Sequence, residues 1–258
     1  MNINMVYGLE IEAEVSDALY DDYAVCEYHS AEEFDMGDVF CCEEDSSIEP
    51  TEFNQGVEFI SKPREYDEKT LESDLNLFLE RTDNLKKVRF NYSTGCHIHL
   101  SFTCDLDNGD SEIINFKESQ IKVKGKYMDL ETNLELDFLK DVNSHILENA
   151  KGILSKDGFE LFKDQFYRHY AQRNHTSFNE GKYRSWFLRN SRKAHIEFRS
   201  FNLRGVENST EFKLLIISTL RILKNRFSNY FKENLKERKV IFEIDLDKET
   251  EEDFENEN

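Results

Sequence analysis

The stretch at residues 91–101 reads NYSTGCHIHLS and predicts a turn that leads into a strand. Serine, threonine and glycine punctuate its first half, and glycine adopts backbone conformations that other residues avoid. In the second half, His97 and His99 fall on one face, whereas Ile98 and Leu100 fall on the other. The imidazoles, about 6.5–7 Å apart at a rise of about 3.3 Å per residue, favour a metal or phosphate site. The alternative is an ordinary pair of surface or core histidines.

A second alternating stretch comes early in the chain, where residues 5–15 read MVYGLEIEAEV. Its apolar residues share one face, and Glu10, Glu12 and Glu14 share the other. Three carboxylates on one face repel one another. Water screens that repulsion if the stretch is a solvated edge strand, and a divalent cation neutralises it if the face lines a pocket.

A third alternating stretch, at 194–203, puts His195, Glu197 and Arg199 on one face. A glutamate and an arginine two residues apart also form simple ion pairs on a sheet surface. Glu58 lies inside an otherwise apolar run, where a lone carboxylate is costly unless it is paired or bound to a metal.

The charge of the chain is strongly negative but unevenly spread. The 258 residues carry a formal net charge of −20, which argues against nucleic-acid binding and against binding to anionic membranes. Between residues 163 and 204, ten Lys and Arg stand against three acidic residues. This basic segment suggests a small bound anion such as a nucleotide or phosphate. Equally, its cations could pair with acids elsewhere in the chain.

The cysteines and the hydropathy pattern indicate a reducing compartment. The five cysteines have no metal-type spacing, and two of them are adjacent, which is awkward for a disulfide framework. The N-terminal residues lack the features of a signal peptide, and no run of 18 apolar residues predicts a membrane span. We therefore expect a cytoplasmic protein.

Apolar spacing outside the three strands predicts an α+β fold. Four helices are expected, at 67–86, 134–154, 157–171 and 209–236. Further expectations are an irregular acidic surface insert at 16–55, a loop or hairpin at 105–130, a last strand at 240–244 and a disordered acidic tail at 245–258. Residues 1–244 would then form a single domain.

The polar faces of the alternating stretches together offer a set of hard ligands. Carboxylates and an imidazole of this kind suit Mg²⁺ or Mn²⁺, whereas zinc would more naturally use cysteine. Carboxylate-held Mg²⁺ beside basic side chains is the chemistry of phosphoryl transfer from a nucleotide.

Four short motifs, in this order, resemble those of the glutamine synthetase superfamily, and most closely its amidoligase branch of carboxylate–amine ligases. They are GLEIE at 8–12, VEFISKP at 57–63, GCHIH at 95–99 and HIEFR at 195–199. The resemblance covers roughly residues 5–205. It implies a glutamine synthetase-like catalytic domain, with a curved antiparallel sheet, flanking helices, two or three Mg²⁺ (or Mn²⁺) ions and ATP.

The resemblance also implies roles for single residues. The metal ligands would be Glu10, Glu12, Glu58, His97 and Glu197. Glu58 would also count among the catalytic residues, together with Arg199, which would contact the acyl phosphate or the carboxylate substrate. Asp45, in the sequence DSSI, would steer the amine.

The nucleotide would lie beside a second group of residues. His99 would be near its phosphates, and Arg184, which follows a tyrosine as in the family, would contact phosphate or substrate. Arg173 and Arg189 are added on charge alone. The chain begins almost at the first glutamate motif, so we do not expect the ring assembly of glutamine synthetase, and the 16–55 insert could cover the site instead.

The implied reaction joins a small-molecule or peptide carboxylate to an amine. The carboxylate takes the terminal phosphoryl group of ATP, and the amine then displaces phosphate to give an amide or isopeptide bond. The main alternative is a non-catalytic module of the same fold that binds or inhibits a basic protein partner. The complete ligand set favours the enzyme. A metal-dependent hydrolase is a third interpretation that explains the basic segment less well.

Overall fold

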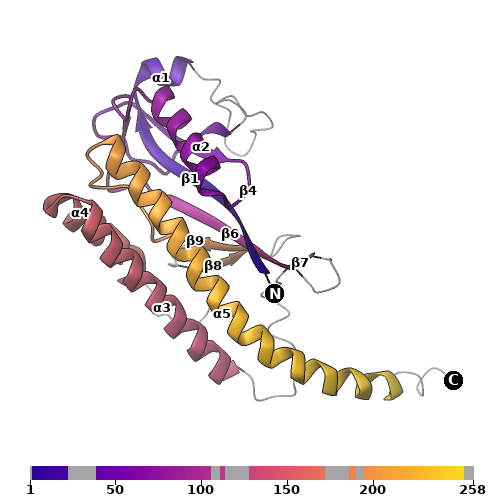
Figure 1. Cartoon of the computed structure of the whole chain (residues 1–258). Coiled ribbons are helices and arrows are strands. Elements are labelled where there is room, and N and C mark those ends of the chain that lie inside the picture. The colour runs from indigo at the N-terminus through magenta and orange to yellow at the C-terminus, as the bar shows by residue number, and fades with distance from the viewer. Residues whose placement is uncertain are drawn as a thin grey trace.

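The computed structural model describes residues 2–22, 39–105, 111–113, 128–171, 186–189 and 195–252. It has an open antiparallel sheet with flanking helices (Figure 1), as the sequence predicts at the level of fold class. The main strands lie side by side in the order β2 (Phe40–Glu44), β3 (Gln55–Ser61), β1 (Asn2–Val15), β6 (Cys96–Asp105), β9 (His195–Phe198) and β8 (Trp186–Arg189).

Three shorter strands complete the sheet. Strands β4 (Arg64–Glu65) and β5 (Val88–Arg89) pair with β1, and β7 (Ser111–Ile113) pairs with β6. Strand β7 pairs with the end of β6, which bears out the hairpin alternative at the start of the 105–130 segment. Residues 106–110 and 114–127 of that segment lie outside the described part of the chain. Strand β1 is therefore central rather than an edge strand, which excludes the solvated-edge interpretation of its three glutamates.

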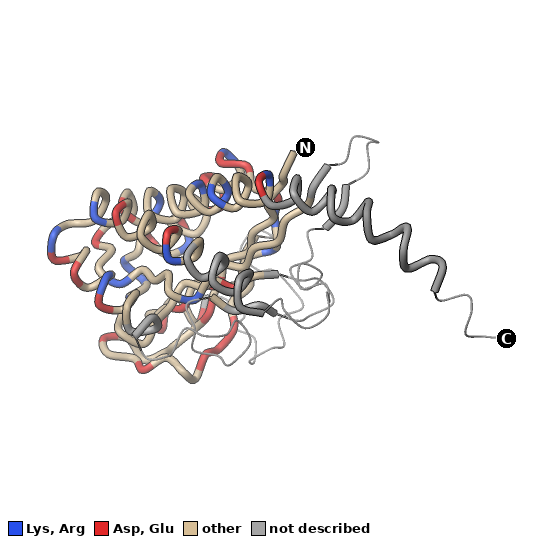
Figure 2. The backbone as a smooth tube through the Cα atoms, turned by 90° about the horizontal axis from the view of Figure 1, so that it is seen from below, with Lys and Arg blue, Asp and Glu red and all other residues tan. Residues whose placement is uncertain are grey.

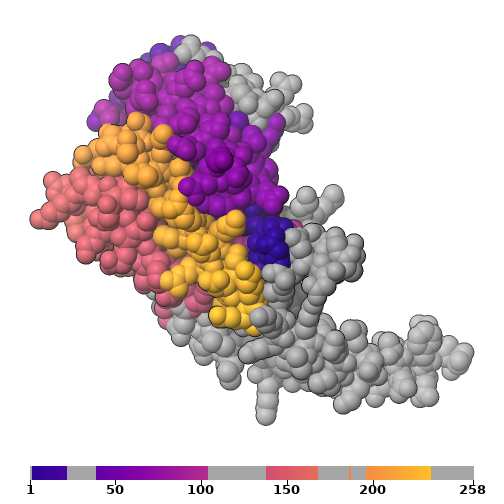
Figure 3. Space-filling model, viewed as in Figure 1, coloured from indigo at the N-terminus to yellow at the C-terminus, as the bar shows by residue number. Residues whose placement is uncertain are grey.

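The helices are α1 (Asp17–Asp22), α2 (Glu68–Arg81), α3 (Met128–Ile153), α4 (Lys156–Ala171) and α5 (Ser209–Glu252). Helix α5 crosses the sheet between α2 and the α3–α4 pair (Figures 1 and 3). Acidic and basic residues are interspersed along the described helices (Figure 2). None of the helices in the described residues has the length and apolar content needed to cross a membrane.

Aromatic rings join the helices to one face of the sheet. Phe59 of β3 contacts Phe78 of α2, with ring centroids 5.1 Å apart, and Phe102 of β6 stacks on Phe227 of α5 at 5.2 Å. On the same face, Trp186 of β8 stacks on Phe198 of β9 at 4.2 Å. Because alternate strand residues face opposite ways, this packing directs the intervening polar residues to the other face of the sheet.

The end of α2 differs from the prediction. The helix ends at Arg81 rather than near residue 86, because the residues after its C-cap, Thr82, leave the helical region. The hydroxyl of Thr82 donates a hydrogen bond to the carbonyl of Phe78 in the last turn. Asp83, Asn84 and Leu85 have φ values of 49°, 52° and 73°. This left-handed conformation is uncommon for residues other than glycine, and it turns the chain into β5.

Two further expectations are corrected. The predicted strand at 240–244 is wrong, because α5 continues without interruption to Glu252. The 16–55 segment is not wholly a surface insert: Phe40, Cys41 and Cys42 of β2 are buried. Residues 23–38 and 253–258 lie outside the described part of the chain. Because α5 includes residues 245–252, the disordered tail predicted at 245–258 stays a prediction for 253–258 alone.

Candidate metal centre

The register of the sheet brings the predicted ligands into neighbouring positions on its polar face. Glu10 of β1 lies opposite His97 of β6, and Glu12 lies opposite Glu58 of β3. One step further along β6, His99 lies opposite Glu197 of β9. Glu10 and Glu197, which are 187 positions apart in the sequence, thus lie on one surface. The pairing of strands β3, β1, β6 and β9 brings them there.

The ligand atoms of these side chains lie close together. Glu10 joins the two histidines, with one carboxylate oxygen 3.1 Å from His97 Nδ1 and the other 2.8 Å from His99 Nε2. His97 Nε2 lies 3.6 Å from Glu12, and His97 Nδ1 lies 3.7 Å from Glu197. In two groups, three ligand atoms lie within 4.8 Å of one another: Glu10, His99 and Glu197, and Glu10, Glu58 and His97. Glu10 belongs to both groups.

Burial makes this concentration of negative charge costly. Burial raises the pKa of Glu12, and burial together with the charges of Glu10 and Glu12 raises the pKa of Glu58 to about 9. Burial also opposes ionisation of Glu10, but hydrogen bonds from His97 and His99 outweigh it and lower the pKa of Glu10. Glu197 is fully buried. Within the centre, therefore, the surroundings of Glu10 favour its charged form, whereas those of Glu12 and Glu58 oppose ionisation.

A divalent cation would relieve this repulsion. Like charges directly opposite one another on adjacent strands destabilise a sheet, and carboxylate oxygens with imidazole nitrogens are suitable ligands for Mg²⁺ or Mn²⁺. The residues therefore fit a divalent ion in donor type and spacing. Glu10 belongs to both groups, so its carboxylate would bind an ion held by either of them.

Gly95 leaves room for the centre. A Cβ atom added there would lie 2.9 Å from His97 Nε2 and 3.2 Å from a carboxylate oxygen of Glu12, closer than side chains normally approach. The Gly95 amide also donates a hydrogen bond of 2.6 Å to Glu12. The glycine of the GCHIH motif thus permits, and helps to orient, the neighbouring ligands.

Arg199 brings a cation to the same place. It directly follows β9, its side chain is largely buried, and it donates a hydrogen bond to the carboxylate of Glu197. The simple ion pair considered from the sequence is therefore present, and it lies within the centre. Two other cations of the basic segment also pair with acids, Lys163 with Glu160 and Arg204 with Asp164. For these three residues, pairing with acids is what the structure shows.

The remaining predicted residues lie at different places. Asp45 follows β2, and its charge contributes to the raised pKa values of Glu12 and Glu58, but it belongs to neither three-residue group. The backbone of Arg189 ends β8, opposite His195. Arg173 and Arg184 fall outside the described residues.

Two buried glutamates near the centre were not assigned from the sequence. Glu43 of β2 is 4% exposed and lies opposite Glu58, so it extends the row of carboxylates across three strands. The run FCCEE carries no alternation that would reveal it. Glu14 is fully buried, but hydrogen-bond donors surround its carboxylate, as described below.

Cys96 does not serve as a nucleophile in this arrangement. Its side chain is fully buried on the core face, and burial, with the charges of Glu12 and Glu10, raises the pKa of its thiol well above the usual value. The thiolate is the reactive form of cysteine, so this position disfavours reaction. The same conclusion follows from its place in the alternating strand.

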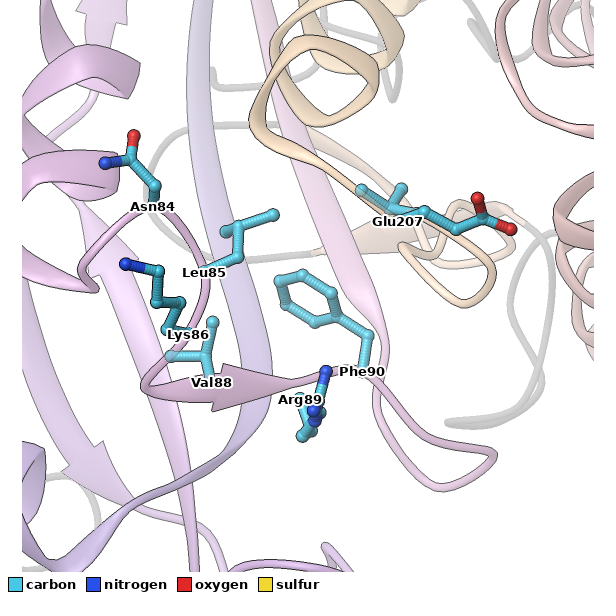
Figure 4. Close-up of a pocket in the computed structure, with 8 residues that line it drawn as sticks. Asn84, Leu85, Lys86, Val88, Arg89, Phe90 and Glu207 are labelled. Carbon is cyan, nitrogen blue, oxygen red and sulfur yellow. The ribbon is translucent and has the colours of Figure 1, made fainter.

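A cavity of about 300 Å³ lies at the α2–β5 connection, away from these ligands. Figure 4 shows Leu85 and Phe90 beside it, whereas the charged ends of Lys86 and Glu207 extend in opposite directions. Its lining residues are Asn84, Leu85, Lys86, Val88, Arg89, Phe90, Val206 and Glu207. None of them is a predicted site residue.

Comparison of the chain with protein-family models finds no match, and comparison with curated protein sequences finds none either. The four motifs and the positions of their residues in the sheet are therefore the basis on which the function of this chain is inferred.

Proposed function

We propose that this protein is an ATP- and Mg²⁺-dependent ligase that joins a carboxylate to an amine, in the manner of the glutamine synthetase-like amidoligases. One observation carries the proposal. The residues that the motif resemblance names as metal ligands come from four strands, and most of them gather in two overlapping groups that share Glu10. Chance alternation in an unrelated sheet gives no reason for such a meeting.

The residues of the centre would hold the cations through Glu10, Glu12, Glu58, His97 and Glu197. Bound Mg²⁺ would neutralise the phosphates of ATP and make the terminal phosphorus open to attack by a carboxylate. Arg199, held beside Glu197, would bind the substrate carboxylate or the acyl phosphate. Asp45, at the rim of the acidic centre, would attract the protonated amine.

The proposed reaction has two steps. An oxygen of the substrate carboxylate bonds to the terminal phosphorus, and the bond from that phosphorus to the bridging oxygen breaks, releasing ADP. The protonated amine first gives a proton to a neighbouring carboxylate, and its nitrogen then bonds to the acyl carbon. The bond from that carbon to the phosphate oxygen breaks, and phosphate leaves with the second proton of the nitrogen. We further propose that the substrates are small molecules or peptides and that the protein acts in the cytoplasm, where ATP is supplied.

Calorimetric titration with a non-hydrolysable ATP analogue tests it. We expect about one nucleotide to bind per chain with Mg²⁺ present and much weaker binding without it. Glu197→Gln should abolish this binding. Glu68→Gln, which alters an exposed carboxylate of α2 paired with Arg221, should leave it unchanged. Binding that is absent with and without Mg²⁺ would overturn the ligase proposal and favour an acidic module for a basic protein partner.

A further inference from the structure

Glu14 is the third glutamate on the polar face of β1, and its surroundings differ from those of Glu10 and Glu12. Its carboxylate accepts hydrogen bonds from the backbone N–H groups of residues 51, 52 and 53 at 2.8, 2.8 and 3.1 Å. The hydroxyl of Thr51 donates another at 2.7 Å, and the side-chain amide of Asn91 donates a fifth. A fully buried carboxylate thus fastens two separate segments of the chain.

Asn91 carries this connection into the turn before β6. Its side-chain amide also donates to the carbonyl of Glu49 at 2.8 Å, and its side-chain oxygen accepts both the N–H and the hydroxyl of Ser93 at 2.7 Å. The backbone N–H of Glu49 donates to the hydroxyl of Ser93 at 2.9 Å. The 49–53 segment and the 91–95 turn are therefore bonded together around the carboxylate of Glu14.

The other end of this turn reaches the metal centre. The Gly95 amide donates to the Glu12 carboxylate at 2.6 Å, and the Glu12 N–H donates to the Gly95 carbonyl at 3.1 Å. His97 follows two residues later. From the opposite side, Gln165 of α4 donates to the carbonyl of Thr94. The position of the Gly95 amide thus depends on a turn that is held on both sides.

We propose that Glu14 is a positioning residue, which fixes the 91–95 turn so that the Gly95 amide orients Glu12, and with it His97, for a divalent cation. This inference rests on the proposed metal centre for its functional consequence. Outer-shell hydrogen bonds commonly fix ligand orientation in metal sites.

The chemistry of the site requires a carboxylate at position 14. Five donors converge on its two oxygens, and an ionised carboxylate is acceptor-only, whereas a glutamine would present its own N–H₂ group to some of these donors. The hydrogen bonds overcome the effect of burial and lower the pKa of Glu14 to about 2.

The test compares Glu14→Gln and Asn91→Ala with Asp67→Ala. Asp67 caps α2 through a 2.8 Å bond to the Thr70 N–H, so its loss destabilises the fold without touching the turn. Hydrogen exchange of the 91–97 peptide is measured by mass spectrometry on the metal-free protein, and Mn²⁺ affinity is measured by electron paramagnetic resonance. We expect exchange about tenfold faster and Mn²⁺ binding about 10–100-fold weaker in the first two variants only.

Each outcome decides the inference. Exchange that changes no more than in Asp67→Ala overturns it, as does faster exchange with unchanged Mn²⁺ affinity, because the turn would then be fastened without positioning Glu12. If Glu14→Gln does not fold, Asn91→Ala supplies both measurements. Wild-type protein that binds no Mn²⁺ removes both the metal centre and the positioning role, while the exchange result still shows whether Glu14 fastens the turn.

Discussion

The polar face of the sheet places its carboxylates in two opposite kinds of surroundings. Glu14 is surrounded by neutral donors from the 49–53 and 91–95 segments, and its pKa falls to about 2. On the neighbouring strand β3, the half-buried Glu58 lies opposite Glu12, two residues along from the position opposite Glu14. Burial and the charges of Glu10 and Glu12 raise the pKa of Glu58 to about 9. A carboxylate already supplied with hydrogen bonds holds the fold together, whereas carboxylates set against one another are what a cation would stabilise.

Replacing the shared ligand should produce the largest change. Glu10→Gln removes an oxygen from both three-residue groups, so we expect Mn²⁺ affinity to fall by more than about 100-fold, since even outer-shell partners contribute about 10–100-fold. Electron paramagnetic resonance of free Mn²⁺ measures this. Glu68→Gln serves as the control. Affinity within a factor of three of wild type would place the ion elsewhere.

The same substitution, glutamate to glutamine, should change the stability of the protein differently at Glu14 and at Glu58. Glu14→Gln leaves buried donors without acceptors, at about 1–3 kcal/mol each, so we expect a loss of about 3 kcal/mol in the free energy of unfolding. Glu58→Gln resembles the protonated carboxyl that its raised pKa favours, so metal-free stability at pH 8 should be equal or higher. Urea unfolding measures both. Equal losses in the two variants would remove the distinction.

The glycine of the GCHIH motif offers a smaller test on the ligand side. In Gly95→Ala, the added methyl group would press on His97 and Glu12, and we expect Mn²⁺ affinity to fall about tenfold. Gly152→Ala on α3 is the matched control, because a Cβ there has no neighbour within 4 Å. That control should be neutral or slightly stabilising, by about 0.5–1 kcal/mol. Similar Mn²⁺ affinities in the two variants would contradict the proposed packing.

The pH dependence of stability should have two limbs in the metal-free protein. Glu14 has a lowered pKa, so its contribution is present above its usual value of 4.5 and is lost as the pH falls toward 2. Glu58 has a raised pKa, so its contribution is complete below 4.5 and is lost as the pH rises through about 9. Each limb is limited to about 1.4 kcal/mol per pH unit for one group.

Urea unfolding across this range, in wild type and both glutamine variants, assigns the limbs. Glu14→Gln should flatten the acid limb, and Glu58→Gln the alkaline limb. Added Mg²⁺ should reduce the alkaline loss in wild type, because the ion favours the ionised carboxylate. An alkaline limb that persists unchanged in Glu58→Gln would assign it to another group.

The sequence predicts those structural features that depend on residues close together in the chain. Period-two alternation correctly separates core from polar faces in β1, β6 and β9, because that pattern is set within each strand. Register is a property of strands far apart in the chain, so the distance from Glu10 to His97 could not be obtained from spacing. The motif resemblance supplied that grouping, and the structure supplies the distances.

Some features have no local signal. Glu14 resembles Glu10 and Glu12 in sequence, and only the loop donors at 51–53 distinguish it. The β-branched and aromatic residues at 240–244 suggested a strand, but the preceding helix α5 continues through them. Leu85 keeps the apolar spacing of α2, yet a left-handed backbone, with φ of 73°, places it beyond the helix end.

Titration of the metal-free wild-type protein with Mn²⁺, followed by electron paramagnetic resonance, tests the central claim most directly. We expect the chain to take up at least one Mn²⁺ and Mg²⁺ to compete for it, because the ligands around Glu10 are carboxylate oxygens and imidazole nitrogens. Mn²⁺ that remains free at every protein concentration would contradict the metal centre, and with it the ligase proposed on its basis.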